Sequence, residues 1–332
     1  MVSPSLGRYH REMRFSLALI ACTALAADRV VLDAHNCYPY DGKYQDRIEI
    51  ALKTGLPLAI EQDLAWYVDP ATGRGRSLLI HGDKPNGREP NMRDYFFERV
   101  RPIVEQALKD NKRDQWPLIT LNLDFKSDEP AHHQAVLKLL TEYQAWLTSA
   151  PRTATPVVRA PLDWKPILVL TGASLVQQKT FHDDVPVGGR LLLFGAGVVV
   201  QRSSELTFVD QLLPNPATNY RRWLNAPWAI VELGGQTKAA DWSTQDARRL
   251  EAIAHRAHRL GYWMRLYTLN GHEPQAGADA GWSRGYNFGS LAEAKKRWKA
   301  SVAAGIDYLA TDQYEEFAPF VKKRKKARIR LP

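Results

Sequence analysis

The sequence has few cysteines and no long apolar segment, and both absences exclude classes of protein. Only 2 cysteines occur among 332 residues, too few for a scaffold held together by disulfides. No apolar run reaches the roughly 20 residues that a membrane-spanning helix requires. Hydrophobic residues make up 45% of the chain and charged residues 24%, which excludes a disordered or collagen-like protein. The composition therefore indicates a globular protein with a sizeable core.

The positive net charge of the chain is confined to its two ends. The formal net charge is +9, of which residues 1–26 contribute +2 and residues 322–332 contribute +7. The body between them is therefore neutral, which excludes a nucleic-acid-binding surface spread over the fold. For the basic tail, residues 322–332, we expect either contact with an anionic membrane surface or a disordered, solubilising end.

The first 26 residues have the pattern of an export signal. A positively charged flank precedes an apolar stretch over residues 15–25, and Ala24 and Ala26 supply the small residues of a signal peptidase site. Two alternatives remain open, namely a lipoprotein box that would leave Cys22 lipidated, and a buried N-terminal helix. We therefore expect an exported protein, periplasmic or secreted.

Strand-like apolar runs alternate with amphipathic helical patterns along residues 28–321, which we predict to form one domain. Eight main strands with intervening helices fit a (β/α)8 TIM barrel, an α/β fold. A doubly wound open sheet is the alternative, but no glycine-rich dinucleotide-binding turn follows the first strand. The predicted main strands cover residues 30–35, 58–64, 118–126, 167–171, 190–194, 228–233, 263–270 and 308–312, with a short strand or hairpin at 77–81. The predicted helices cover residues 44–53, 95–109, 131–147, 244–260 and 291–304.

Carboxylates cluster at the predicted carboxyl ends of two strands, where TIM barrels build their active sites. Glu61 and Asp63 end the second strand, and Asp124 and Lys126 end the third. Because strand side chains alternate, the members of each pair point to the same face. Converging carboxylates repel one another unless a cation neutralises them, and all-oxygen ligands favour Mg²⁺ or Ca²⁺. We therefore predict one divalent cation bound by Glu61, Asp63 and Asp124.

Two histidines accompany these carboxylates. His35 ends the first predicted strand, and His81 ends the short strand after the second. Imidazoles titrate near neutral pH and suit general acid and base roles, although a lone histidine at a strand end is more often structural. We predict His35 and His81 as the acid–base pair and Lys126 as the third catalytic group. Four further histidines, on predicted helices, are expected at the surface: His132, His133, His255 and His258.

The order His, Glu-x-Asp, His, Asp-x-Lys resembles the PLC-like phosphodiesterase superfamily, which includes glycerophosphodiester phosphodiesterases, phosphatidylinositol-specific phospholipases C and sphingomyelinase D. Residues 267–270 resemble the aromatic-Thr-x-Asn motif of the family's seventh strand, and residues 305–312 the Gly-x-Asp-x-x-x-Thr-Asp motif of its eighth. The resemblance covers most of the mature chain. The pair His35-Asn36 departs from the His-Arg of glycerophosphodiesterases and is closer to sphingomyelinase D.

The resemblance implies an exported, metal-dependent phosphoric diester hydrolase that acts on a glycerol- or lipid-derived phosphodiester, in some members through a cyclic phosphate. His35 would be the base and His81 the acid. We expect a monomer without a nucleic-acid partner. A carboxylate-based glycoside hydrolase barrel and a non-catalytic headgroup-binding barrel are the alternatives. Substrate contacts are predicted at Asn36, Glu232, Asn270, Trp282, Arg284 and Tyr286, because these residues lie at strand ends or on the loop after the seventh strand.

Overall fold

The structure is a computed structural model that describes residues 30–39, 44–82, 84–202 and 204–327. The predicted signal segment, residues 1–26 with Cys22, lies outside the described residues, and so do residues 328–332 of the basic tail. The export and domain boundaries therefore stay predictions. None of the helices within the described ranges combines the length and the apolar character needed to cross a bilayer.

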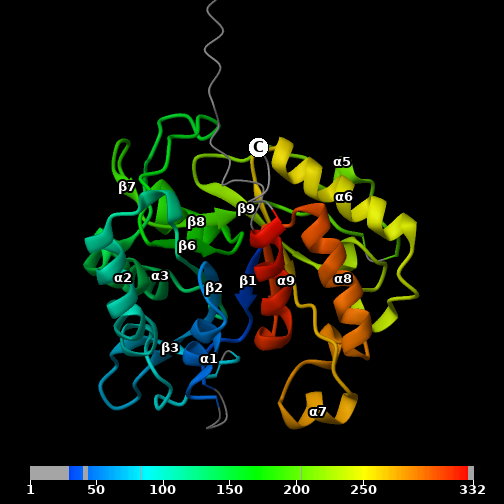
Figure 1. Cartoon of the computed structure of the whole chain (residues 1–332). Coiled ribbons are helices and arrows are strands. Elements are labelled where there is room, and N and C mark those ends of the chain that lie inside the picture. Colours follow the sequence, from blue (N-terminus) through cyan, green and yellow to red (C-terminus); the bar gives the residue numbers. More distant parts are fainter. Residues whose placement is uncertain (1–29, 40–43, 83, 203, 328–332) are drawn as a thin grey trace, which may run out of the picture.

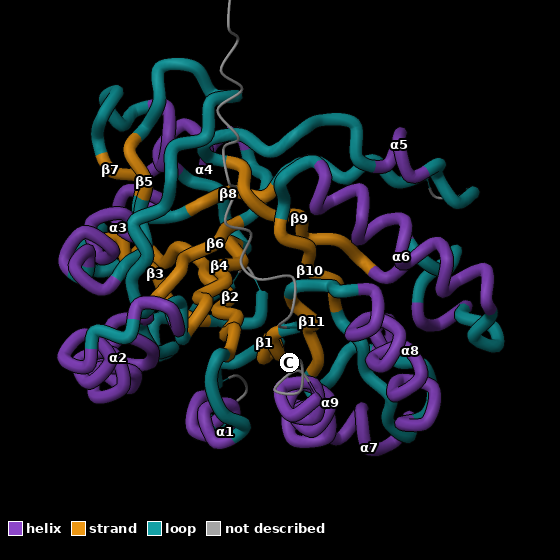
Figure 2. The backbone as a smooth tube through the Cα atoms, turned by 45° about the horizontal axis from the view of Figure 1, so that its top comes forward, coloured by secondary structure: helices purple, strands orange, loops and turns teal. Residues whose placement is uncertain are grey.

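Eight parallel strands close into a barrel that is surrounded by helices (Figures 1 and 2). The first strand pairs with both the second and the last, so the sheet has no open seam. This confirms the predicted (β/α)8 TIM barrel and excludes the open sheet. The barrel strands are β1 (Val31–Ala34), β2 (Leu58–Val68), β4 (Ile119–Phe125), β6 (Ile167–Thr171), β8 (Phe194–Ala196), β9 (Arg221–Pro227), β10 (Trp263–Tyr267) and β11 (Tyr308–Thr311).

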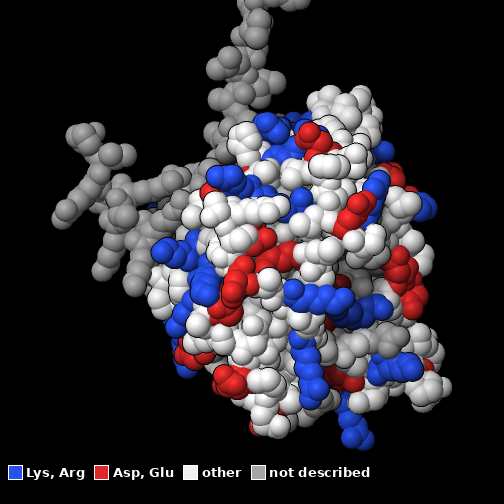
Figure 3. All heavy atoms as spheres, turned by 90° about the vertical axis from the view of Figure 1, so that its right-hand side faces the viewer, with Lys and Arg blue, Asp and Glu red and all other residues white. Residues whose placement is uncertain are grey.

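Capping residues set the ends of several outer helices. Ser243 and Asp246 form a capping box at the start of α6 (Thr244–Arg259), and Gly305, at φ 81°, ends α8 (Leu291–Ala304). On the face covered by these two helices, charges of both signs are interspersed (Figure 3). The other helices are α1 (Arg47–Lys53), α2 (Glu98–Asp110), α3 (Pro130–Glu142), α4 (Leu175–Gln178), α5 (Val209–Leu212), α7 (Pro274–Asp279) and α9 (Tyr314–Ala327). Single helical turns are η1 (Arg93–Phe97), η2 (Arg113–Gln115), η3 (Gln144–Trp146), η4 (Lys179–Asp183), η5 (Trp228–Ile230), η6 (Gln236–Lys238) and η7 (Arg284–Tyr286).

Two barrel strands lie away from their predicted positions. The predicted sixth strand, residues 228–233, begins with the turn η5, and the true strand β9 lies immediately before it. The predicted fifth strand splits into β7 (Arg190–Leu191), which pairs with β5 (Ala150–Pro151), and the barrel strand β8. Strand β9 does not look like a buried strand in the sequence, because it carries polar residues whose hydrogen-bond partners lie inside the fold. Asn225 of β9, for example, accepts a hydrogen bond from Arg265 of β10 at 2.8 Å.

Strand β2 is longer than predicted and continues beyond the barrel. It pairs in antiparallel fashion with β3 (Gly75–Leu79), which confirms the predicted hairpin. The Ile80 N–H donates to the carbonyl of Asp63 at 3.2 Å, so the hairpin returns the chain to the level of the barrel mouth. Apolar side chains fill the amino-terminal part of the barrel interior, among them Ala59, Leu168 and Trp223. Polar side chains are therefore concentrated at the carboxyl-terminal end, where the site lies.

Candidate active site

His35 and Asp312 meet where the first and last strands of the barrel pair. They directly follow β1 and β11, whose register places Ala34 opposite Thr311. His35 Nδ1 lies 3.1 Å from both carboxylate oxygens of Asp312, and both residues are buried. Burial lowers the pKa of His35, but the charges of Asp312 and Glu61 outweigh it and raise the pKa above its ordinary value. An ionised carboxylate only accepts hydrogen bonds, so Nδ1 carries the proton and Nε2 is the nitrogen that can accept one.

The Asp312 carboxylate is held from two further sides. Arg47 Nη2 donates to Asp312 Oδ1 at 3.2 Å and to the His35 carbonyl at 3.1 Å. Asn270 Nδ2 donates to Asp312 Oδ2 at 2.6 Å. Burial alone would raise the pKa of Asp312, but His35 and Arg47 lower it to about 2. The predicted substrate residue Asn270 therefore lies behind the histidine and orients its carboxylate partner.

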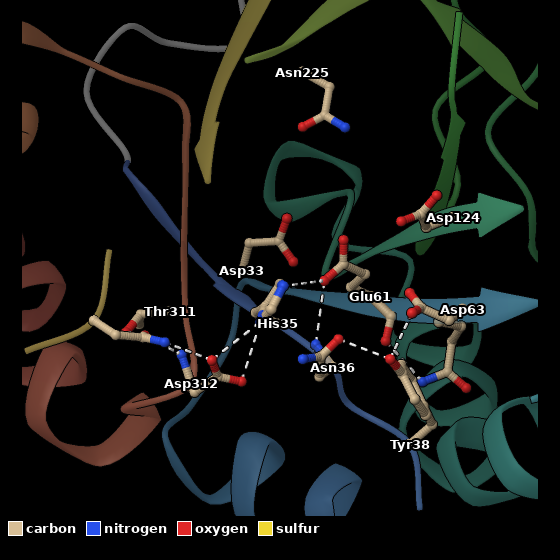
Figure 4. Close-up of polar contacts among 12 residues, drawn as sticks. Asp33, His35, Asn36, Tyr38, Glu61, Asp63, Asp124, Asn225, Thr311 and Asp312 are labelled. Atoms are coloured by element: carbon tan, nitrogen blue, oxygen red, sulfur yellow. Dashed lines mark hydrogen bonds and ion pairs between the residues drawn. The ribbon is translucent and has the colours of Figure 1, made fainter. Parts of the chain in front are cut away.

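The three predicted metal ligands come together as expected (Figure 4). Strands β2 and β4 pair in register, with Asp63 opposite Asp124, and Glu61 lies two residues earlier on the same face. One oxygen from each of these three carboxylates lies within 4.8 Å of the others. Lys126 Nζ bridges Asp63 and Asp124, at 2.9 Å from Asp63 Oδ2 and 2.6 Å from Asp124 Oδ2. Burial and the charges of Asp124 and Glu61 raise the pKa of Asp63 to about 7, in spite of Lys126.

Arg265 joins this cluster to the floor of the barrel, and the sequence analysis missed it. The guanidinium is buried, donates from Nε to Asp33, and donates from Nη2 to Glu61 Oε1 at 3.0 Å. Burial raises the pKa of Glu61, but Arg265 and His35 outweigh it and lower the pKa below its ordinary value. A signal was present in the sequence, because Asp33 and Arg265 are opposite charges in the middle of two predicted barrel strands. Such residues need partners inside the barrel.

Asn36 lies in the site, and Tyr38 is a second residue that the sequence analysis missed. The Asn36 backbone N–H donates to Glu61 Oε2 at 3.2 Å, with the residue in the left-handed region at φ 50°. The Tyr38 hydroxyl lies 2.6 Å from Asp63 Oδ2 and 2.7 Å from Asn36 Oδ1 (Figure 4). This hydroxyl therefore fixes the same Asp63 oxygen that Lys126 contacts. Tyr38 follows the strand rather than ending it, so no strand-end pattern points to it.

The three predicted loop residues have different surroundings. The ring of Tyr286 stands edge-on to the imidazole of His35, with centroids 5.7 Å apart, and it borders Tyr267 in the same manner. Trp282 packs against His272 of the same loop, at 5.2 Å. Arg284 is exposed. Of these predicted substrate residues, Tyr286 is the one whose ring contacts the site.

Glu232 differs from its predicted setting, whereas His81 lies close to the end of the short strand that was expected to carry it. Glu232 does not end a strand, because it follows η5, and Arg297 of α8 donates to its two carboxylate oxygens at 2.7 and 2.8 Å. The Trp228 indole donates to the same carboxylate at 2.7 Å. Glu232 therefore belongs to a buried ion pair that anchors helix α8.

His81 follows β3 at the level of Asp63, with an exposed side chain.

The expected surface position of His132 and His133 is wrong. Both are fully buried, because α3 packs against the β2–β3 hairpin. His132 lies 2.8 Å from Ser77 Oγ and 3.0 Å from Ser127 Oγ, and its ring stacks on Trp66. Burial, together with the neighbouring His133, lowers the pKa of His132 to about 4.

No protein-family model matches the sequence, and no curated protein sequence does. The fold is similar to solved structures of dihydropteroate synthases. For 7,8-dihydropteroate synthase from Vibrio fischeri ES114 the identity is 13% and the TM-score 0.40, over 93% of this chain and 96% of the other. For Plasmodium falciparum HPPK-DHPS the values are 10% and 0.45 in a variant bound to pteroate. The wild-type protein with STZ-DHP gives the same two values. The chain spans about half the length of HPPK-DHPS, namely 50% and 49% of those two chains.

These comparisons overturn the resemblance to the PLC-like phosphodiesterases. The solved structures that the fold is similar to are dihydropteroate synthases, so the predicted family is wrong. The predicted phosphoric diester hydrolase activity and its lipid-derived substrate are wrong with it, and the predicted membrane partner is withdrawn. The glycoside hydrolase and headgroup-binding alternatives gain no support. Identities of 13% or less and TM-scores below 0.5 carry no substrate or activity over to this chain.

Proposed function

We propose that the barrel mouth is the active site of a metal-dependent enzyme in which His35 transfers a proton to or from an oxygen-bearing substrate. The observation that carries this proposal is the position of His35 between two sets of carboxylates. Its Nδ1 is held by Asp312, and its Nε2 lies 3.6 Å from Glu61 Oε2, at the edge of the predicted metal cluster. A histidine oriented by a buried carboxylate on one nitrogen can exchange a proton through the other.

The residues at the mouth fit a hard divalent cation. The donors of Glu61, Asp63 and Asp124 are all oxygens, and they project from strands β2 and β4, which are fixed by the barrel. Burial, together with the charges of Asp124 and Glu61, raises the pKa of Asp63 in spite of its contact with Lys126. These three carboxylates would therefore hold Mg²⁺ or Ca²⁺, which would polarise a substrate oxygen and stabilise developing negative charge.

Other residues at the barrel mouth orient His35, offset charge and limit the space for a substrate. Asp312 keeps the proton of His35 on Nδ1 and stabilises the imidazolium that forms when Nε2 accepts a proton. Lys126 holds Asp63 and Asp124 together and offsets part of their negative charge, and Tyr286 borders His35 and limits the space beside it. His81 stays a prediction for the second proton-transfer group, because its strand returns to the level of Asp63.

The test is a search for turnover that depends on His35. The purified protein is incubated with Mg²⁺ and a small-molecule cell extract, and mass spectrometry follows every compound that disappears. We expect His35→Asn and Asp124→Asn to abolish the depletion, and excess chelator to do the same. His255→Asn, an exposed histidine on α6, is the matched control and should behave as wild type. Depletion that persists in His35→Asn would contradict the proposal.

A further inference from the structure

Asn270 contacts two parts of the site at once. It is fully buried just beyond β10, and its side chain makes three hydrogen bonds. Nδ2 donates to Asp312 Oδ2 at 2.6 Å, and Oδ1 accepts from the Asp312 N–H and from the Thr311 hydroxyl, each at 2.9 Å. Because Asp312 in turn orients His35, the Asn270 amide supports the His35–Asp312 pair from behind.

The backbone of the same residue holds the loop that covers His35. The Asn270 N–H donates to the Tyr286 carbonyl at 3.1 Å, and the Phe288 N–H donates to the Asn270 carbonyl at 2.9 Å. These two bonds flank Asn287, whose side-chain amide exchanges hydrogen bonds of 3.0 and 2.9 Å with the backbone of His272. The loop of residues 271–289 is thus closed on itself and attached to the barrel at Asn270.

We infer that Asn270 is a positioning residue that couples this loop to the His35–Asp312 pair. A displacement of the loop at Tyr286 moves the backbone of Asn270, and its side chain then pulls on the carboxylate that orients His35. A buried residue whose polar groups are all engaged cannot absorb such a displacement without breaking a bond. Contact of a substrate with Tyr286 would therefore tune the orientation of His35. This inference rests on the proposed function for its catalytic meaning, but the coupling itself does not require turnover.

The coupling is measured on the purified protein without substrate. The Nδ1 proton and nitrogen resonances of His35 report the histidine side, and 3-fluorotyrosine introduced at position 286 reports the loop side. Asn270→Ala keeps the backbone bonds but removes the three side-chain hydrogen bonds, and we expect it to shift both signals. Asn287→Ala loosens the loop without touching His35 or Asp312, and we expect it to shift the His35 resonances as well. Because the Tyr286 ring also borders His35 directly, the comparison is repeated with Tyr286→Leu, where the shift should persist. Arg284→Ala, on the same loop with an exposed side chain, is the matched control and should leave His35 unchanged.

Two results would overturn the inference. One is a change confined to a single signal in Asn270→Ala, which would give Asn270 a merely local structural role. The other is a shifted fluorine signal in Asn287→Ala with unchanged His35 resonances, and this arm decides the matter if Asn270→Ala does not fold. Neither readout depends on a metal or on turnover. A failure of the proposed enzyme activity with both couplings present is therefore distinguishable from a failure of the coupling.

Discussion

His35 and Asp312 are 277 positions apart in the chain and form a hydrogen-bonded pair because the barrel closes. Each is the first residue after its strand, and the register of β1 against β11 places the two strand ends side by side. The contact exists only when the last strand has docked on the first. Assembly of the His35–Asp312 pair and closure of the barrel are therefore the same event.

The first prediction concerns the stability that Asp312 provides. Asp312→Asn removes the charge that compensates the buried Arg47 guanidinium, and leaving a buried charge unpaired costs about 3 kcal/mol or more. We expect the free energy of unfolding, measured by urea denaturation, to fall by that amount. Asp210→Asn is the matched control, because the Asp210 side chain is 80% exposed, and it should change stability by less than about 0.5 kcal/mol. Equal effects of both substitutions would refute this view of Asp312.

The second prediction separates Glu232 from the site. Glu232 and Glu293 both pair with Arg297, but Glu232 is buried and the Glu293 side chain is 29% exposed. Glu232→Gln should lower the free energy of unfolding by about 3 kcal/mol, and Glu293→Gln by less than about 1 kcal/mol. Both variants should bind Mn²⁺ as tightly as wild type in a calorimetric titration. If Glu232→Gln bound Mn²⁺ more weakly than wild type while its free energy of unfolding was unchanged, Glu232 would instead belong to the metal site.

The third prediction concerns stability at acidic pH. The pKa of His132 is lowered from 6.5 to about 4 in the fold, so the unfolded chain binds more protons at this position between those values. The free energy of unfolding should therefore fall as the pH falls from about 6.5 to about 4, and this contribution should level off below. The full effect is about 3 kcal/mol at roughly 1.4 kcal/mol per pH unit.

Urea denaturation at a series of pH values measures this contribution. His132→Gln should flatten the curve over that interval, whereas His255→Gln, on the surface of α6, should not. A wild-type slope retained in His132→Gln would show that another group is responsible.

The sequence predicted the carboxylate cluster because its geometry follows from local rules. The alternation of side chains along a strand places Glu61 and Asp63 on one face, and Asp124 follows in the same way on its own strand. Barrel closure then brings strand ends together without further information. The same rules identified His35 and located the loop that carries Tyr286.

The remaining parts of the site depend on pairings between distant strands. The ion pair of Asp33 with Arg265 joins β1 to β10, and neither residue is informative without the other. Asn225 escaped notice because its strand, β9, lacks the apolar run that a buried strand usually shows. The mistaken family has a similar cause. A few polar residues at strand ends reflect the way in which any TIM barrel builds a site, so their order carries little information about the substrate.

The most direct test of the central claim is paramagnetic broadening by Mn²⁺. If Glu61, Asp63 and Asp124 bind a divalent cation beside His35, substoichiometric Mn²⁺ should broaden the imidazole signals of His35 beyond detection. The effect falls steeply with distance, so the signals of His255, on the outer helix α6, should stay sharp. Asp124→Asn should abolish the broadening, and excess Mg²⁺ should reverse it in the wild-type protein. A His35 signal that remains sharp at saturating Mn²⁺, or equal broadening of His35 and His255, would contradict the account.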